Sequence, residues 1–161
     1  MVNNHPYLSY VVGDATEPPG QEPRIIAHVC NDAGGWGKGF VLALSKKWKE
    51  PEVVYRAWNR PGVLRLGRIQ RVMVEENLWV VNMVAQHGYA RAGDRVPLDY
   101  FALETCLNKL AIQARFLKAS VHMPRIGTGL GGGSWPRIKD IIVETLCNKR
   151  IDVTIYDLAS K

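Results

Sequence analysis

A cluster of glycines between residues 127 and 133 is the part of this sequence best suited to binding chemistry. Five of these seven residues are glycine. An apolar run at residues 119–123, which we interpret as a strand, comes before them, and a helical pattern at residues 134–149 follows. Glycines at a strand-to-helix junction allow positive φ and let N–H groups converge, and the helix adds further N–H groups and a positive dipole. The stretch therefore predicts a phosphate-binding loop.

A second glycine-rich segment, residues 31–39, follows another predicted strand at residues 24–30 and precedes a helical pattern. Ligands of α/β folds bind at the carboxyl ends of strands, so the two loops could face one crevice and hold a diphosphate. Neither loop ends in Gly-Lys-Ser/Thr, as a P-loop does. The Gly-x-Gly-x-x-Gly spacing that begins at Gly127 lies too late in the chain for a dinucleotide-binding fingerprint. Each loop taken alone could also be a purely structural turn.

Polar side chains follow two of the predicted strands. Asn31 and Asp32 come directly after residues 24–30, and Gln86 and His87 come directly after residues 78–85. Such groups could orient a water molecule or contact a sugar hydroxyl, and a histidine could act as a general base. Alternatively, Asn31 and Asp32 cap their loop, and His87 is an inert surface side chain.

Four further side chains have a binding interpretation, a structural one or both. Asp14 follows the first strand, where its carboxylate could accept from a purine amino group or cap a turn. Tyr156 could stack on a base or be a core tyrosine. Trp36, a large aromatic residue among glycines, could form a wall of the pocket. His28 lies within a buried strand and is interpreted as a core histidine with its hydrogen bonds satisfied.

The elements that would position these side chains alternate along the chain. Apolar, β-prone runs predict strands at residues 8–12, 24–30, 68–74, 78–85, 119–123 and 152–158. Helical spacing predicts helices after residue 39 and at residues 51–59, 97–118 and 134–149. The polar segment 86–96 is predicted to be a loop. Strands with little polar alternation between helices indicate a mixed sheet covered on both faces.

Length and composition indicate one ordinary globular domain spanning residues 1–161. The chain is 47% hydrophobic and 22% charged, and we find neither a secretory signal nor an apolar run long enough to cross a bilayer. Its three cysteines are widely spaced and do not form a disulfide or zinc pattern. We therefore expect a cytoplasmic protein without a metal, a cofactor or a membrane partner.

The net charge of +6 fits an anionic ligand or partner such as a nucleotide, a phosphate or a nucleic acid. The basic residues are scattered, however, and no dense basic tract with interleaved aromatic residues occurs. A solvated basic surface explains most of them, so nucleic acid is not expected to be the main partner.

Four segments together resemble the macrodomain family. They are Gly13-Asp14, the loop at residues 31–40, Met-Pro-Arg-Ile-Gly-Thr-Gly-Leu at residues 123–130 and Ile-Tyr-Asp-Leu at residues 155–158. They occur in the family's order across almost the whole chain. They are most similar to the branch that contains terminal ADP-ribose protein glycohydrolase, the macrodomain of a chromatin remodeller and small bacterial relatives. The resemblance implies a three-layer α/β/α fold with a central mixed β-sheet that binds ADP-ribose and, in some members, cleaves it from proteins.

Transferred residue by residue, the resemblance implies contacts with each part of ADP-ribose. Asp14 would meet the adenine amino group, Tyr156 would lie near the adenine, and Asn31 would lie near the distal ribose. The first diphosphate loop would centre on Gly37 and Gly39, and residues 127–130 would form the second. The expected binding residues are Asp14, Ala15, Gly35, Trp36, Gly37, Lys38, Gly39, Phe40, Arg125, Ile126, Gly127, Thr128, Gly129, Leu130 and Tyr156.

The departures from the family concern catalysis. In terminal ADP-ribose glycohydrolase a lysine attacks the anomeric carbon and an aspartate assists, but the matching positions here are Gln86 and Gly131. A glutamine cannot form the lysyl adduct, so that mechanism is not expected. The Asn-Ala-Ala-Asn signature of the other hydrolytic branch is also absent.

Two functions compete on this basis. The first is hydrolysis of acidic-residue-linked ADP-ribose by direct attack of water. The candidate catalytic residues are Gln86, Asn31 and Asp32, any of which could orient the water, and a substrate phosphate or Asp32 would take its proton. The second is a non-catalytic reader of ADP-ribose, which explains the missing lysine and aspartate more simply. A nucleic-acid binder is a third, weaker interpretation that rests on the basic charge alone.

Overall fold

A computed structural model describes residues 5–88 and 96–159, which include a six-stranded sheet. The strands lie in the order β1-β6-β5-β2-β4-β3, and each pairs in parallel with its neighbours except β3, which is antiparallel to β4. The predicted mixed sheet is therefore confirmed. The strands are β1 (Leu8–Val12), β2 (Arg24–Asn31), β3 (Ile69–Glu75), β4 (Leu78–Gln86), β5 (Ser120–Pro124) and β6 (Val153–Asp157).

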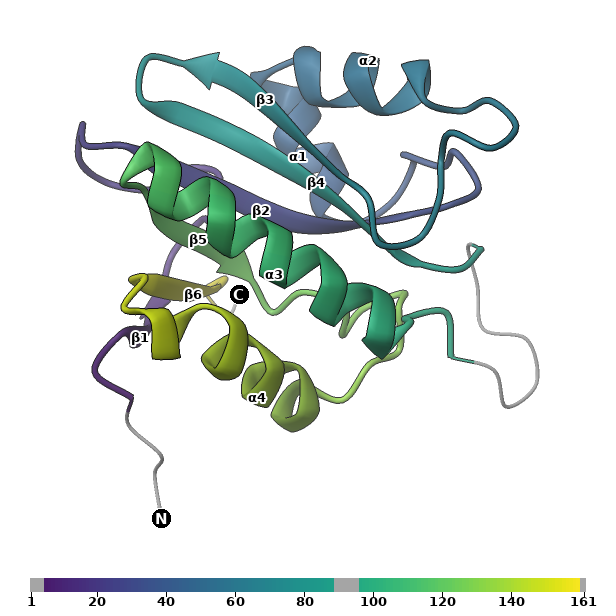
Figure 1. The fold of residues 1–161 in the computed structure, drawn as a ribbon. Helices are drawn as coiled ribbons and strands as arrows, with labels where there is room; N and C mark the ends of the chain where they lie inside the picture. Colours follow the sequence, from purple (N-terminus) through teal and green to yellow (C-terminus); the bar gives the residue numbers. More distant parts are fainter. Residues whose placement is uncertain (1–4, 89–95, 160–161) are drawn as a thin grey trace.

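Helices cover both faces of this sheet, as Figure 1 shows. Helices α1 (Phe40–Lys47) and α2 (Glu50–Ala57) lie on one face, next to β2, β3 and β4. Helices α3 (Tyr100–Leu117) and α4 (Trp135–Thr145) lie side by side on the other, followed by the short 3-10 helix η1 (Cys147–Lys149). The expected three-layer α/β/α architecture is confirmed.

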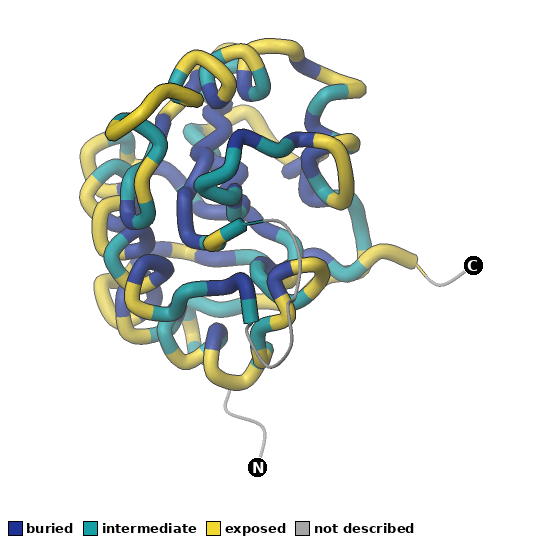
Figure 2. Tube along the Cα trace, turned by 90° about the vertical axis from the view of Figure 1, so that its right-hand side faces the viewer, coloured by how far each residue is buried: buried dark blue, intermediate teal, exposed yellow. Residues whose placement is uncertain are grey.

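The sheet is buried between two apolar clusters, and Figure 2 shows the buried segments in the interior of the molecule. Strand β4 is the clearest case, because each of its residues except the last, Gln86, is buried. A strand covered on both faces needs apolar side chains on both, which explains its nearly continuous apolar sequence. Among the described residues, no helix combines the length and apolarity needed to span a membrane.

Two local features set the pairing of β4 with its neighbours. The β3–β4 hairpin turns at Asn77, which has a φ of 58°. At the other end of β4, a bulge between Cys30 and Asn31 changes the register so that Asn31 pairs with Gln86. The bulge thus places the polar ends of β2 and β4 next to each other.

Two of the predicted helices have different bounds in the structure. Helix α3 begins at Tyr100 rather than at residue 97, because Leu98 forms a bridge with Gln86 and the Asp99 side chain caps the helix by accepting from the N–H of Ala102. The predicted helix 134–149 is divided into α4 and η1. Of the predicted loop 86–96, residues 89–95 lie outside the described part of the chain.

Candidate functional site

A cavity of about 770 Å³ opens at the carboxyl ends of β2, β4, β5 and β6. This volume is typical of sites for small molecules and cofactors. The cavity is lined by residues 28–31, 35, 37–41, 86, 124–131 and 156–158. Both glycine-rich loops contribute, so the structure brings them to one crevice, as the sequence predicted.

Asn31 shapes the first of these loops. Its Oδ1 accepts from the N–H groups of Ala33 and Gly35, at 3.0 Å each, and its Nδ2 donates to the carbonyl of Gly35 at 2.9 Å. The hydroxyl of Tyr55, a fully buried residue of α2, donates to the Asn31 carbonyl at 2.6 Å and lies 2.9 Å from Oδ1. Asn31 lines the cavity, but its side chain is committed to holding the turn.

The N-terminus of α1 faces the cavity through the residues from Gly37 to Val41. Gly39, at the N-cap position, has a φ of 83°, and no side chain caps the helix. The first turn contains no acidic residue. Uncapped N–H groups and the positive end of the helix dipole therefore meet the cavity, which favours an anion there.

The second loop folds tightly upon itself. Gly127 has a φ of 75°, and its carbonyl accepts from the N–H of Gly133 at 2.8 Å. The Gly131 carbonyl accepts from the N–H of Leu98 at 3.1 Å. A Cβ atom at position 131 would lie 2.8 Å from the Gly127 carbonyl oxygen and 3.2 Å from the Gln86 Oε1. The fold of this loop thus excludes the family's aspartate at position 131 unless the backbone shifts.

This close approach gives a prediction with a matched control. Gly131→Ala is expected to lower the free energy of unfolding by roughly 1–3 kcal/mol, because the new Cβ meets backbone rather than a flexible side chain. Gly129→Ala should change it by less than about 0.5 kcal/mol, since a Cβ there would have no neighbour within 4 Å. Urea unfolding of both variants measures the difference. Equal stabilities would contradict the geometry described for residue 131.

Gln86 and Asn31 provide side-chain amides at one end of the cavity. The backbone carbonyl of Gln86 accepts from the N–H of Asp32 at 2.9 Å. The side-chain Nε2 of Gln86 donates to the Gly88 carbonyl at 3.1 Å. Its Oε1 lies beside Gly131 of the second loop. The Gln86 side-chain amide therefore lies between Gly88 and the second glycine loop.

Asp32 and His87 contact each other rather than the cavity. The Asp32 Oδ2 lies 2.7 Å from the His87 Nδ1, and its Oδ1 accepts from the N–H of Gly88 at 2.9 Å. Neither residue lines the cavity, and the His87 side chain is 65% exposed. Both carboxylate oxygens thus hold the turn that follows β4, rather than capping the loop to which Asp32 itself belongs.

The opposite end of the cavity is formed by residues 156–158 and Arg125. The Arg125 guanidinium donates to both oxygens of Asp157, at 2.7 and 2.9 Å. The rings of Tyr10 and Trp135 lie 5.2 and 5.1 Å from the guanidinium carbon. Hydrogen bonding from Arg125 holds the pKa of Asp157 below its ordinary value. Arg125 is therefore fixed along the cavity wall by a charge pair and two rings.

Three residues predicted to bind the ligand do not line the cavity. The Asp14 Oδ1 accepts from the N–H and the hydroxyl of Thr16 at 2.8 and 2.7 Å, which makes it a turn cap, and Ala15 is buried. Trp36 is 4% exposed, and its Nε1 donates to the Ser45 hydroxyl at 2.7 Å. Its ring packs against Tyr55. The structure corrects the interpretation of Trp36 as a pocket wall, because burial of the indole anchors the loop to α1 and α2.

The sequence did not point to His28 and Cys30, which line the floor of the cavity. Both were visible in the sequence only as part of a buried strand. The imidazole of His28 is hydrogen-bonded to the Asn82 side chain, and burial lowers its pKa to about 4. Burial also raises the pKa of the Cys30 thiol, so it stays protonated at neutral pH and is a poor nucleophile.

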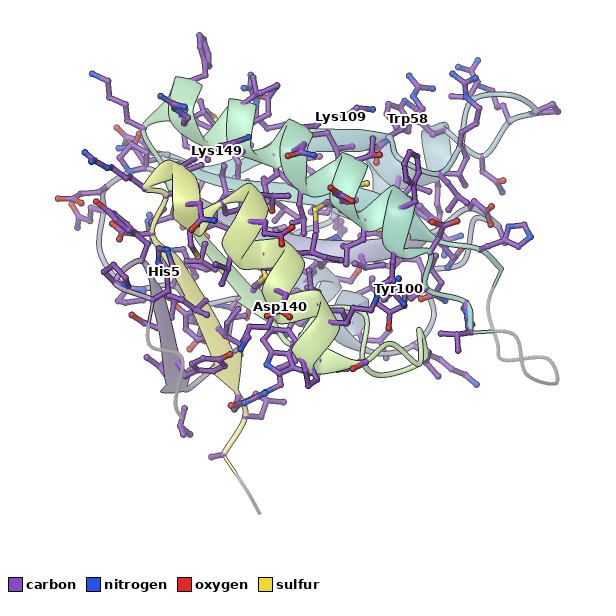
Figure 3. The ribbon with its side chains drawn as sticks, turned by 60° about the horizontal axis from the view of Figure 1, so that its bottom comes forward. His5, Trp58, Tyr100, Lys109, Asp140 and Lys149 are labelled. Carbon is purple, nitrogen blue, oxygen red and sulfur yellow. The ribbon has the colours of Figure 1, made fainter. Side chains whose placement is uncertain are left out.

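Tyr55 was missed as well, since nothing in the sequence distinguishes it from any other apolar-face residue of α2. The sequence likewise predicted Tyr100 only as a residue of the helix at 97–118. It lies at the start of α3 beside the beginning of α4 (Figure 3), and its hydroxyl accepts from the N–H of Ser134 at 2.8 Å. Tyr55 and Tyr100 thus stabilise the two glycine-rich loops without lining the cavity.

Two known proteins whose names refer to ADP-ribose are similar to this chain at low identity. The DNA ADP-ribosyl glycohydrolase of Thermus aquaticus is 24% identical over 93% of this chain and 41% of its own length. The structure of DarTG of Thermosipho africanus in complex with ADP-ribose has a TM-score of 0.73 at 20% identity, covering 94% of this chain and 41% of that one. At these identities the structural likeness concerns the fold alone.

Higher similarity is found to three other proteins. The mouse chromodomain-helicase-DNA-binding protein 1-like is 32% identical over 92% of this chain, which spans only 17% of that protein. A solved protein from Bacteroides thetaiotaomicron is 51% identical with a TM-score of 0.91, over 94% of this chain and 98% of that one. A macrodomain protein from Streptomyces coelicolor is 49% identical with a TM-score of 0.82, over 93% of this chain and 98% of that one.

No protein-family model matches the sequence. The similarity to the Streptomyces protein, at 49% identity, nevertheless extends over nearly the full length of both chains. This chain therefore belongs to the macrodomain family.

Proposed function

We propose that this chain, as a single macrodomain, binds ADP-ribose in the cavity at the carboxyl end of its sheet. The observation that carries the proposal is the meeting of two glycine-rich loops with the uncapped N-terminus of α1. A diphosphate between the loops would receive backbone N–H groups from both sides. Lys38, which also lines the cavity, would add positive charge, whereas the charge of Arg125 is paired with that of Asp157. The distal ribose would lie near Asn31 and Gln86, and the adenine near Tyr156.

We further propose that the protein hydrolyses ADP-ribose from acidic residues of proteins by direct attack of water. The oxygen of a water molecule held by the Gln86 amide forms a bond to the anomeric carbon. The bond from that carbon to the acceptor carboxylate breaks, and its electron pair leaves with the carboxylate. The water proton passes to a diphosphate oxygen and then to solvent. A carboxylate is a good leaving group, so positioning can supply much of the required rate.

Asn31 and Asp32 support this chemistry indirectly in the proposal. Asn31 keeps the first loop in shape, and Asp32 holds the turn of residues 86–88 that carries Gln86. The proposed route forms no covalent adduct between the protein and the sugar, so it does not require a lysine at position 86.

Gln86→Ala provides the sharpest test of the proposed chemistry. It is expected to slow release of ADP-ribose about 30-fold, which corresponds to roughly 2 kcal/mol for one lost hydrogen bond to the reacting water. Binding of free ADP-ribose, measured by calorimetry, should change by less than about threefold. Gln113→Ala, on the exposed side of α3, is the matched control. Unchanged release by the Gln86 variant would contradict the assigned role.

A reader function is the main alternative, and the replacement of the family's lysine and aspartate by Gln86 and Gly131 favours it. Tight binding of ADP-ribose without release from any acceptor would establish it.

Nucleic acid is a second candidate acceptor, favoured by the net charge of +6 and by the name of the Thermus relative. Release of ADP-ribose from DNA but not from a modified protein, with a steep dependence on salt, would identify that acceptor.

A further inference from the structure

A row of three polar side chains, two of them buried and Ser120 half-buried, crosses β5 and β6 on the sheet face that lies opposite α3 and α4. The Ser120 hydroxyl lies 2.8 Å from the Nε2 of His122, and the His122 Nδ1 lies 2.7 Å from the Tyr156 hydroxyl. His122 is 6% exposed and Tyr156 is 7% exposed. Their neighbours in sequence point to the other face of the sheet, as strand alternation requires, and belong to the core beneath the helices. These neighbours are Val121, Met123 and Ile155.

Both hydrogen bonds of this row can form when His122 is neutral. In a neutral imidazole one nitrogen donates and the other accepts, while a serine and a tyrosine hydroxyl can each do either. Burial, followed by the nearby charge of Arg24, lowers the pKa of His122 to about 4. Burial also raises the pKa of Tyr156. At neutral pH both hydrogen bonds therefore join uncharged groups, and each ring nitrogen of His122 has one partner.

Tyr156 connects this row to the cavity. The residue lines the cavity, while its hydroxyl is bonded to His122, which does not line it. One edge of the ring faces Gly13, where an added Cβ would lie 3.6 Å from the Tyr156 Cδ2. The ring plane is thus fixed by a hydrogen bond at its far end and by backbone along one edge.

We infer that His122 is a positioning residue that holds the Tyr156 ring as the wall of the adenine end of the pocket and thereby sets the affinity for ADP-ribose. The inference rests on the proposed function, because it requires that the cavity bind ADP-ribose with the base beside Tyr156. His122 acts only through Tyr156, and Ser120 orients the imidazole from the other side.

Two substitutions of His122 separate a positioning role from a merely structural one. An asparagine amide can take the place of Nδ1 and keep the bond to Tyr156, whereas a glutamine amide can take the place of Nε2 and keep the bond to Ser120. Each variant loses one hydrogen bond and most of the ring. We expect His122→Gln to raise the Kd for ADP-ribose about tenfold and His122→Asn by less than about threefold.

A double substitution tests whether the effect passes through the phenol. Tyr156→Phe should weaken binding as much as His122→Gln does, and the combined variant should be no weaker than either within about threefold. Additive losses, or equal affinities of the His122→Asn and His122→Gln variants, would overturn the inference even though ADP-ribose still binds.

Fluorine NMR of protein labelled with 3-fluorotyrosine gives a readout that needs no ligand. The signal of Tyr156 is identified as the one missing in Tyr156→Phe. Both variants lose the imidazole beside the Tyr156 ring, but only His122→Gln also loses the bond to its hydroxyl, so the signal should shift further in His122→Gln than in His122→Asn. Equal shifts in the two variants would overturn the inference. Failure of the wild-type protein to bind ADP-ribose would instead overturn the proposed function, and the fluorine signal would still decide whether His122 positions Tyr156.

Discussion

Asn31→Ala is expected to weaken binding of ADP-ribose about 100-fold, the largest loss we predict for one side chain at the first glycine loop. The substitution removes the acceptor for the N–H groups of Ala33 and Gly35 and the donor to the Gly35 carbonyl. Three bonds worth about 1 kcal/mol each then no longer define the loop. Tyr55 keeps its bond to the backbone of residue 31, so the fold should persist.

Calorimetry with free ADP-ribose measures this effect, and urea unfolding shows whether the variant is folded. Asn108→Ala is the matched control, because residue 108 is on the exposed side of α3. If the Asn31 variant binds within about threefold of the wild type, the loop does not depend on the side chain and the assignment is wrong.

Acidification is expected to destabilise the fold strongly between about pH 6.5 and pH 4. His28 and His122 both have a pKa lowered from 6.5 to about 4, in each case mainly by burial. The unfolded chain takes up protons below pH 6.5, whereas the folded chain does so only near pH 4, so stability is complete above pH 6.5 and falls as the pH drops. At about pH 4.5 each histidine should have cost roughly 2–3 kcal/mol.

Urea unfolding at a series of pH values measures this slope. Near pH 5.25 the free energy of unfolding should fall by about 2.7 kcal/mol per pH unit, which corresponds to uptake of two protons on unfolding. His122→Asn removes one of the two groups and should halve the slope. A free energy that stays constant from pH 6.5 to pH 4.5 would show that these histidines are not buried in the neutral form.

The layers and the site's location could be predicted from the sequence because both depend on local patterns. Short, β-prone apolar runs such as residues 78–85 are typical of strands covered on both faces, and glycine clusters at strand ends indicate where a backbone must turn. These patterns placed both loops at one end of the sheet, and the cavity lies there. The resemblance to macrodomains, which rests on four short motifs, is confirmed by the similarity to the Streptomyces protein over nearly its full length.

The roles of single side chains depended on contacts that no local pattern contains. Asp32 was expected in the pocket, but its two oxygens are taken by Gly88 and His87, which lie more than fifty residues away in the sequence. Trp36 is buried because α1 and α2 offer a core large enough for an indole. Tyr55 reaches Asn31 only because α2 packs across the end of β2. Side-chain orientation at a loop is thus decided by tertiary neighbours.

The most direct test of the central claim is a release assay with a mono-ADP-ribosylated protein that carries labelled ADP-ribose on a glutamate. The purified wild-type protein is incubated with this substrate, and free ADP-ribose is followed over time beside a sample without the protein. We predict time-dependent release that is faster than spontaneous loss and is slowed by Gln86→Ala. No release above the spontaneous rate, while free ADP-ribose still binds, would contradict a hydrolase and identify the chain as a reader.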